Sequence, residues 1–348
     1  MSPTELRVGV IGTGRMGSFH VETWDRVEAA RILAVADPSE AAAGACIRRR
    51  PIDWHADWHT LIAREDIDAV SVAAPTEQHA RIALAALHAG KHVLVEKPVA
   101  STLEDGTRMA AAARATGLKL MVGHVERFNP VVEMARRFVT EGRLGRVLRI
   151  NGTRVGPLPA RIRDAGVAID LAIHDLDVMQ YVLGRDITSV YAEGGRFVHP
   201  SQEDMLTCLL RFGSDGPFGM LDVNWITPTG KRDLTVIGEG GMLHADYVAQ
   251  EVLFTESAGA ANGWKELAQL RGDAASAVVR FSLNRVEPLR AELEAFLRCI
   301  VDDTNEPVSV YDGCRALVAG LAVRNSAAMS RPVTLLGMPS APAVRHAA

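Results

Sequence analysis

A glycine-rich stretch near the amino terminus constrains the fold more than any other feature of this sequence. Its residues are Gly12, Thr13, Gly14, Arg15, Met16 and Gly17. They follow an apolar run that ends at Ile11 and precede a stretch with helical periodicity. A G-x-G-x-x-G motif between a strand and a helix permits a tight turn and brings backbone N–H groups close to a bound anion. We therefore predict that this motif binds the pyrophosphate of a dinucleotide.

The residues around this motif alternate between short β-branched runs and alanine-rich stretches, which is typical of βαβ units and a parallel sheet. The predicted strands cover residues 7–11, 32–36, 69–73, 92–95 and 119–122, and the predicted helices cover about 15–28, 39–49, 77–89 and 102–116. We predict a doubly wound Rossmann domain over residues 1–125.

The pattern changes after Asn129 and Pro130. Longer alternating segments follow at about 146–154, 187–198, 205–212, 218–226, 232–238 and 242–255, with helices at about 130–141, 167–183, 286–302 and 312–329. They predict an α+β domain over residues 126–335 with an open, mostly antiparallel sheet, followed by a loose tail over residues 336–348. Because an open sheet face often contacts another subunit, we expect a homodimer or homotetramer.

Composition excludes several classes of protein. The formal net charge is -4 and the sequence has no long basic run, which argues against a nucleic-acid partner. No segment has the roughly 20 consecutive apolar residues of a membrane span, and the amino terminus lacks the pattern of a signal peptide. The four cysteines are scattered without a C-x-x-C pair, so neither a zinc site nor a disulfide framework is indicated. We expect a cytoplasmic protein with small-molecule ligands.

Asp37 ends the second predicted strand, 20 residues after Gly17. An acidic side chain there can accept hydrogen bonds from the adenine-ribose hydroxyls and repels a 2'-phosphate. The next residues are Pro38, Ser39 and Glu40, with no arginine among them, so NAD is favoured over NADP. The alternative is an aspartate that serves only the turn before Pro38.

Further cofactor contacts are expected where the next strand ends, because such sheets bind ligands at the carboxyl ends of their strands. The candidates there are Ala74, Pro75, Thr76 and His79. The alternative is an ordinary strand-to-helix turn in which Thr76 is the N-cap.

A lysine follows the predicted strand 92–95, in the sequence Glu96-Lys97-Pro98. Its position at the carboxyl edge of the sheet predicts contact with the cofactor by Glu96 and Lys97. It also allows Lys97 to donate a hydrogen bond to a substrate hydroxyl, which lowers the pKa of that hydroxyl. The alternative is an ordinary surface lysine.

Asp170 and His174 lie four residues apart in a predicted helix, a spacing that places both on one helix face. The carboxylate can orient the imidazole, which then suits a base that removes the hydroxyl proton as hydride leaves the carbon. The alternatives are a surface ion pair and a metal site with His124. A complete hydride mechanism needs no metal, so we predict none.

These three motifs, in this order, resemble those of the glucose-fructose oxidoreductase/inositol dehydrogenase/rhizopine catabolism (Gfo/Idh/MocA) family. The resemblance covers about residues 5–335. It implies that Lys97, Asp170 and His174 orient the substrate and relay its proton while a sugar or polyol hydroxyl is oxidised with NAD.

Two further stretches, 123–130 and 154–161, resemble the members of that family that act on the 3-hydroxyl of UDP-N-acetylglucosamine. This resemblance implies substrate contacts by His124, Arg127, Asn129, Arg154, Arg161 and Arg163, in addition to Lys97 and His174. Arginines can hold a diphosphate through forked hydrogen bonds, although solvated loop arginines are equally compatible with the sequence. The alternative substrate is inositol or another free polyol, and the alternative of another class is a non-catalytic NAD-binding regulator.

Overall fold

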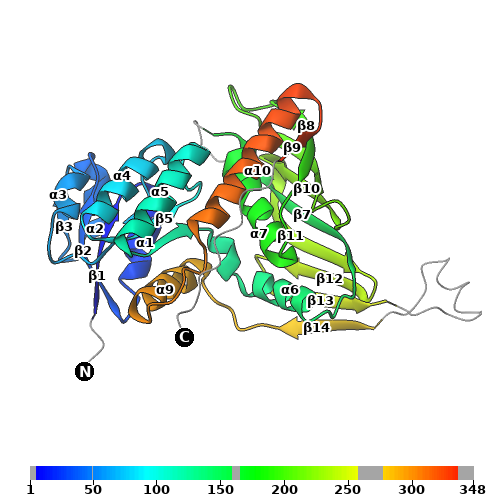
Figure 1. Ribbon diagram of the computed structural model, residues 1–348, viewed down its shortest axis with the longest axis horizontal. Helices are drawn as coiled ribbons and strands as arrows, with labels where there is room; N and C mark the ends of the chain where they lie inside the picture. Colours follow the sequence, from blue (N-terminus) through cyan, green and yellow to red (C-terminus); the bar gives the residue numbers. More distant parts are fainter. Residues whose placement is uncertain (1–4, 49, 159–164, 258–276, 336–348) are drawn as a thin grey trace, which may run out of the picture. The chain divides into compact units, whose positions relative to one another are not determined.

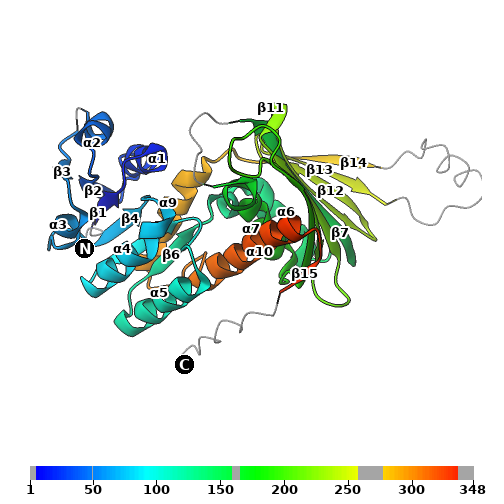
Figure 2. The same ribbon diagram turned by 90° about the horizontal axis from the view of Figure 1, so that it is seen from above.

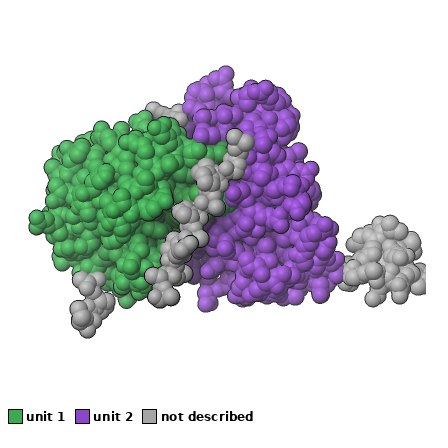
Figure 3. All heavy atoms as spheres, in the orientation of Figure 1, with its two compact units in different colours: residues 1–125, 287–318, 338–348 green, residues 126–286, 319–337 purple. Residues whose placement is uncertain are grey.

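The computed structural model describes residues 5–48, 50–158, 165–257 and 277–335. The chain divides into two compact units, coloured separately in Figure 3. Unit 1 comprises residues 1–125, 287–318 and 338–348, and unit 2 comprises residues 126–286 and 319–337. Unit 1 therefore includes a segment, 287–318, that lies far along the chain from its other described residues. The predicted tail, 336–348, lies outside the described residues.

Unit 1 contains a parallel six-stranded sheet with the order β3-β2-β1-β4-β5-β6 (Figures 1 and 2). Its strands are β1 (Leu6–Ile11), β2 (Ala30–Ala36), β3 (Asp53–His55), β4 (Ala69–Val72), β5 (His92–Glu96) and β6 (Leu120–Gly123). This is the doubly wound topology that the alternation predicts. The sequence analysis missed β3, whose three residues are too few to show a periodic pattern.

Helices cover both faces of this sheet: α1 and α2 lie on one face, and α4 and α5 on the other (Figure 2). The helices of unit 1 are α1 (Arg15–Trp24), α2 (Glu40–Ile47), α3 (Trp58–Ile62), α4 (Thr76–His88), α5 (Leu103–Thr116) and α9 (Pro288–Val301). Because both faces are covered, every residue of β4 is buried, which explains the largely apolar character of the central strands. Helix α5 ends at Gly117, which has a φ of +70° as a left-handed C-cap.

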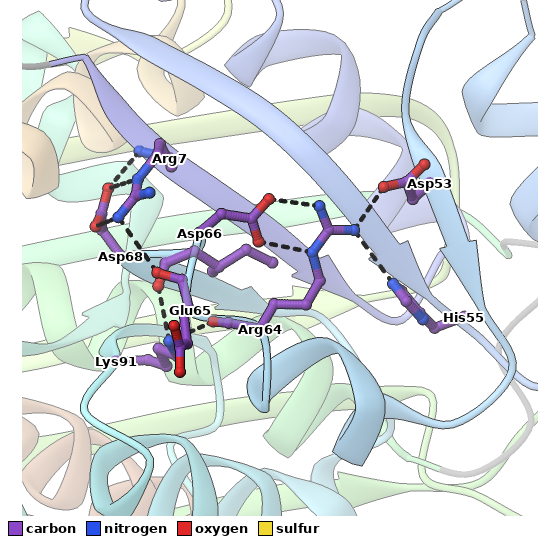
Figure 4. Close-up of polar contacts among 9 residues, drawn as sticks. Arg7, Asp53, His55, Arg64, Glu65, Asp66, Asp68 and Lys91 are labelled. Atoms are coloured by element: carbon purple, nitrogen blue, oxygen red, sulfur yellow. Dashed lines mark hydrogen bonds and ion pairs between the residues drawn. The ribbon is translucent and has the colours of Figure 1, made fainter.

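A group of ion pairs lies at the amino-terminal edge of the same sheet (Figure 4). Arg7 pairs with Asp68 across the starts of β1 and β4, and Arg64 pairs with Asp66 and Asp53. Lys91, just before β5, is 7% exposed. Its ammonium donates hydrogen bonds to the carbonyl oxygens of residues 64 and 67, at 2.6 and 2.8 Å.

Unit 2 contains a nine-stranded sheet with the order β14-β13-β12-β11-β7-β10-β9-β8-β15 (Figure 1). Its strands are β7 (Val147–Pro157), β8 (Ser189–Gly195), β9 (Met205–Arg211), β10 (Phe218–Asn224), β11 (Ile226–Gly238), β12 (Gly241–Asp246), β13 (Glu251–Glu256), β14 (Val278–Ser282) and β15 (Val333–Thr334). Strands β7 and β10 pair in parallel, and the other neighbours are antiparallel. The predicted fold class, a Rossmann domain followed by an open and mostly antiparallel sheet, is confirmed.

Helices cover one face of this second sheet (Figure 2). The helical elements of unit 2 are η1 (Val125–Phe128, whose first residue belongs to unit 1), α6 (Pro130–Thr140), η2 (Ala168–Ala172), α7 (Ile173–Leu183) and the second half of α10 (Val310–Met329). Their apolar side chains form one core with the inward residues of the strands. Among the described residues, no helix combines the length and the apolar character that crossing a membrane requires.

Candidate active site

The predicted pyrophosphate loop joins β1 to α1. Gly12 has a φ of +90°, and a Cβ at Gly17 would collide with the carbonyl oxygen of Gly12, so this close turn requires glycine at both positions. Gly14 faces open space, and α1 begins there with neither a side-chain cap nor an acidic residue in its first turn. The helix terminus is therefore suited to a bound phosphate, because its N–H groups and dipole favour negative charge.

A cavity of about 350 Å³ opens beside this loop, at the carboxyl ends of β1, β2 and β4. Its lining includes Gly12, Asp37, Ala74, Pro75 and Trp58. The Asp37 carboxylate is held in place by two backbone N–H groups, of residues 13 and 39, at 2.7 and 2.8 Å. Each oxygen keeps a further lone pair for a ribose hydroxyl. The residues present thus fit the adenosine half of a dinucleotide.

Arg81 also lines this cavity, with its guanidinium 5.2 Å from the ring centre of Trp58. No arginine is among the residues that directly follow Asp37. Arg81 lies in the second turn of α4, and parallel-sheet packing brings it to the pocket. No local sequence signal marks it.

Two of the predicted cofactor contacts, Thr76 and His79, lie in the first turn of α4. Thr76 is the first residue of α4 and Pro75 is the N-cap, so the alternative in which Thr76 caps the helix is wrong. His79 is 1% exposed, and its two ring nitrogens lie 2.8 Å from the carbonyl oxygens of Ala74 and Pro98. Its contacts are therefore with the loops that follow β4 and β5.

Lys97 is half-buried and directly follows β5. The neighbouring Glu96 is 7% exposed, and its carboxylate turns back into unit 1. One oxygen lies 2.9 Å from Nε2 of His20, and the other accepts a hydrogen bond from the backbone N–H of Lys97 at 3.1 Å. Burial raises the pKa of Glu96, but the bond to His20 and the nearby positive charges outweigh burial and hold that pKa below its ordinary value. Glu96 is therefore ionised, and its carboxylate fixes the position of the Lys97 backbone.

Asp170 and His174 lie in unit 2, and both are half-buried. Asp170 belongs to the π-helical turn η2, and His174 is the second residue of α7. The regular helix expected from residue 167 thus begins with a π-turn, a feature frequent at functional sites. Glu203 fixes this turn, because its backbone carbonyl accepts from the N–H of residue 167 at 3.0 Å and its carboxylate accepts from that of residue 168 at 3.2 Å.

Two buried ion pairs anchor the helix that carries His174. Arg154 donates to Asp175 at 2.6 Å and to Glu126 at 2.8 Å, and Arg127 forms a two-bond pair with Asp177. Burial raises the pKa of Asp175, and Arg154 opposes this shift. Each of these guanidiniums is paired with a carboxylate. Removing the arginine or its carboxylate would leave an uncompensated buried charge. Arg127 and Arg154 therefore hold α7 in place.

The other predicted substrate contacts are distributed as follows. His124, in unit 1, is 1% exposed just after β6. Asn129 is 2% exposed, and its side chain caps α6 and donates to the carbonyl of residue 247. Arg161 and Arg163 lie outside the described residues. In the described ranges, no group of three or more His, Cys, Asp or Glu side chains is arranged to hold a metal ion.

Arg232 is a charged residue near Asp170 that the sequence analysis missed. It lies on β11 directly opposite Arg154 of β7. Burial and the positive charge of Arg154 lower its pKa, whereas Asp170 is among the carboxylates that raise it. Only the strand register brings Arg232 and Arg154 together, so the spacing of residues along the chain does not predict their proximity.

Two family models together match more than half of the chain. One, described as an oxidoreductase family with an NAD-binding Rossmann fold, matches residues 6–124, and the GFO/IDH/MocA C-terminal domain matches residues 132–244. The chain belongs to the Gfo/Idh/MocA family. It is therefore an NAD-dependent dehydrogenase that acts on CH–OH groups of sugars or inositols, and the regulator alternative does not hold.

Members of the Gfo/Idh/MocA family with different substrates resemble this chain over nearly its whole length. Myo-inositol 2-dehydrogenase of Thermotoga maritima is 29% identical, over 95% of this chain and 98% of that protein. UDP-N-acetylglucosamine 3-dehydrogenase of Acidithiobacillus ferrooxidans is 26% identical, over 92% and 96%. The crystal structure of a probable dehydrogenase from Thermotoga maritima has a TM-score of 0.78 at 28% identity and covers 94% of this chain and 99% of its own. Several further relatives are inositol dehydrogenases.

Proposed function

We propose that this enzyme oxidises one ring hydroxyl of an inositol, or of a free polyol with the same ring, to a ketone. The observation that carries the choice of a free polyol is the burial of Arg127 and Arg154 in carboxylate pairs. A nucleotide sugar requires cations for its diphosphate, and these two arginines already neutralise buried carboxylates. The frequency of inositol dehydrogenases among the full-length relatives supports the same choice.

In this proposal the side chains divide the chemistry between them. Lys97 donates a hydrogen bond to the reacting hydroxyl, and His174 accepts its proton while Asp170 keeps the imidazole oriented. NAD, when bound, would supply the hydride acceptor for this oxidation. The proposal requires Lys97 and His174 to act on the same alcohol. The fixed backbone at Lys97 and the anchored helix α7 favour such precise placement, because both side chains start from rigid elements.

The experiment is a turnover assay with NAD and, separately, myo-inositol, scyllo-inositol and UDP-N-acetylglucosamine. We expect at least one inositol to reduce the cofactor, and His174→Asn to abolish that reaction while NAD affinity stays unchanged. Turnover of UDP-N-acetylglucosamine alone would replace the proposed substrate with a nucleotide sugar. An active His174→Asn variant would contradict the assigned base.

We also propose that the enzyme is a homodimer or homotetramer that associates through the uncovered face of the nine-stranded sheet. Large apolar side chains of that sheet are exposed, among them Leu209, Phe218, Met220 and Met242. The strand register places Met220 beside Leu209 on neighbouring strands, so they form part of one surface. Light scattering should report an oligomer that Met220→Asp weakens. A wild-type monomer at micromolar concentration would contradict the proposal.

A further inference from the structure

His79 lies inside unit 1 between two loops that belong to the cofactor side of the sheet. The Nε2 atom of its ring is 2.8 Å from the carbonyl oxygen of Ala74, and its Nδ1 atom is 2.8 Å from that of Pro98. Ala74 lines the dinucleotide cavity, and Pro98 follows Lys97. One buried side chain thus connects the loop after β4 to the loop after β5.

The two partners of the ring are unusual because both are carbonyl oxygens, which only accept hydrogen bonds. A neutral imidazole carries one N–H donor, so it satisfies one of the two carbonyls, whereas an imidazolium carries two N–H donors and satisfies both. The number of bonds between these loops therefore depends on the protonation of His79.

The electrostatic surroundings allow both forms. Burial lowers the pKa of the His79 imidazole below its ordinary value, and the two carbonyls and Glu96 oppose that shift. Among the described residues, the charged groups that act on the ring are Glu96, which favours the imidazolium, and Lys97, which disfavours it. Both lie at the end of β5. The balance places the change in charge on the acidic side of neutrality.

We propose that His79 is a positioning residue for the cofactor, tying the Ala74 loop to the Lys97 loop with one hydrogen bond when neutral and with two when protonated. It contacts the loops and acts through them. The inference rests on NAD binding, which family membership establishes, and does not depend on which polyol is oxidised.

The first test is the dissociation constant for NAD, measured by calorimetric titration across the pH range. His79→Asn keeps a polar donor but is too short to reach both carbonyls. We expect it to weaken NAD binding about tenfold near neutral pH, the value of roughly one hydrogen bond, and by more at the lower pH values at which the wild-type ring is protonated. His88→Asn is the matched control, because His88 is exposed at the end of the same helix and should leave affinity unchanged. A His79→Asn protein that binds NAD like the wild type at every pH would overturn the proposal.

A second test uses the wild-type protein and therefore stands even if the variant fails to fold. Nitrogen-15 NMR of the NAD-bound enzyme reports which ring nitrogens carry a proton. We expect one protonated nitrogen on His79 near neutral pH and two at lower pH, both slow to exchange with water. A ring whose protons exchange as freely as those of His88 overturns the proposal. Failure to oxidise any inositol would contradict the proposed function and leave both results for His79 intact.

Discussion

The two edges of the six-stranded sheet both carry charged and polar groups, but these groups have different partners. At the amino-terminal edge, Arg7 and Arg64 are paired with aspartates, and Lys91 is bonded to two carbonyls (Figure 4). At the carboxyl edge, the loop after β1 is glycine-rich and a cavity opens beside it. One edge satisfies its polar groups internally, and the other leaves N–H groups and carboxylate lone pairs for a ligand.

Strand β5 shows this difference most directly, because a lysine stands at each end of it. Lys91 precedes the strand and is 7% exposed, and Lys97 follows the strand and is half-buried. Both lysines begin from the same rigid strand. If Lys97 acts as proposed, position relative to the sheet, more than residue type, separates the structural lysine from the catalytic one.

The largest effect is expected for Lys97→Met. If Lys97 donates to the reacting hydroxyl, the change should lower kcat by about a thousandfold, within the usual range for a lost acid–base group. The thermal midpoint should stay close to that of the wild type, because the Lys97 side chain is half-buried at a strand end. Steady-state kinetics and a melting curve on the same sample give both values. A variant with normal kcat and reduced stability would reverse the assignment of the two lysines.

A buried carboxylate behind the carboxyl edge should give the next largest effect. Glu292 of α9 is 0% exposed, and neither of its oxygens has a hydrogen-bond partner among the described residues. Burial, together with the charge of Glu96, raises the pKa of Glu292 well above its ordinary value of 4.5. The folded protein therefore keeps a proton that the unfolded chain releases once the pH exceeds about 4.5. This makes the fold less stable as the pH rises from there toward the folded pKa.

Glu292→Gln removes that proton equilibrium. The free energy of unfolding of the variant, relative to the wild type, should therefore increase with pH above about 4.5, with a limiting slope of about 1.4 kcal/mol per pH unit for one proton. Denaturant titrations at a series of pH values measure this difference. Glu294→Gln, on the same helix but half-exposed, is the control for the substitution itself. A pH-independent difference for Glu292→Gln would mean that Glu292 is ionised in the folded protein.

Lys91→Met should have a smaller effect, and on stability alone. The methionine retains the length of the stem but leaves two carbonyls without their donor, which should cost about 2 kcal/mol of unfolding free energy. Turnover should be unchanged, since the residue lies at the edge away from the cofactor loop. Chemical denaturation and kinetics measured together test both statements. A loss of kcat without a loss of stability would remove the distinction between the two edges.

The sequence predicts the carboxyl edge far better than the amino-terminal one. The glycine motif, Asp37 and Lys97 lie in short stretches whose local pattern has a direct physical meaning, so their place in the fold follows from the alternation of strands and helices. The ion pairs of Arg7 with Asp68 and of Arg64 with Asp53 join residues distant in sequence. No local pattern encodes them.

The same reason explains why the sequence does not predict the contacts of Arg154 in unit 2. Arg154 lies on an alternating strand and reads as a candidate diphosphate ligand, but the register of β7 and the packing of α7 bury it against Asp175 and Glu126. Whether an arginine faces a ligand or a buried carboxylate depends on tertiary contacts. The π-turn at Asp170 is likewise set by bonds to Glu203, more than thirty residues away along the chain.

Arg7→Met should have the smallest effect, although Arg7 makes one of the ion pairs drawn in Figure 4. Its guanidinium donates two hydrogen bonds to Asp68, but 42% of the Arg7 side chain and 34% of the Asp68 side chain are exposed. Water and salt screen an exposed pair, and holding two side chains in one geometry costs entropy, so most of the attraction is lost. We expect a melting temperature close to that of the wild type and an unchanged kcat, with any small difference disappearing at high salt. A large loss of melting temperature that does not depend on salt would show that the geometry of the Arg7–Asp68 pair matters more than its exposure. Lys91 would then no longer make the strongest polar contact at the amino-terminal edge.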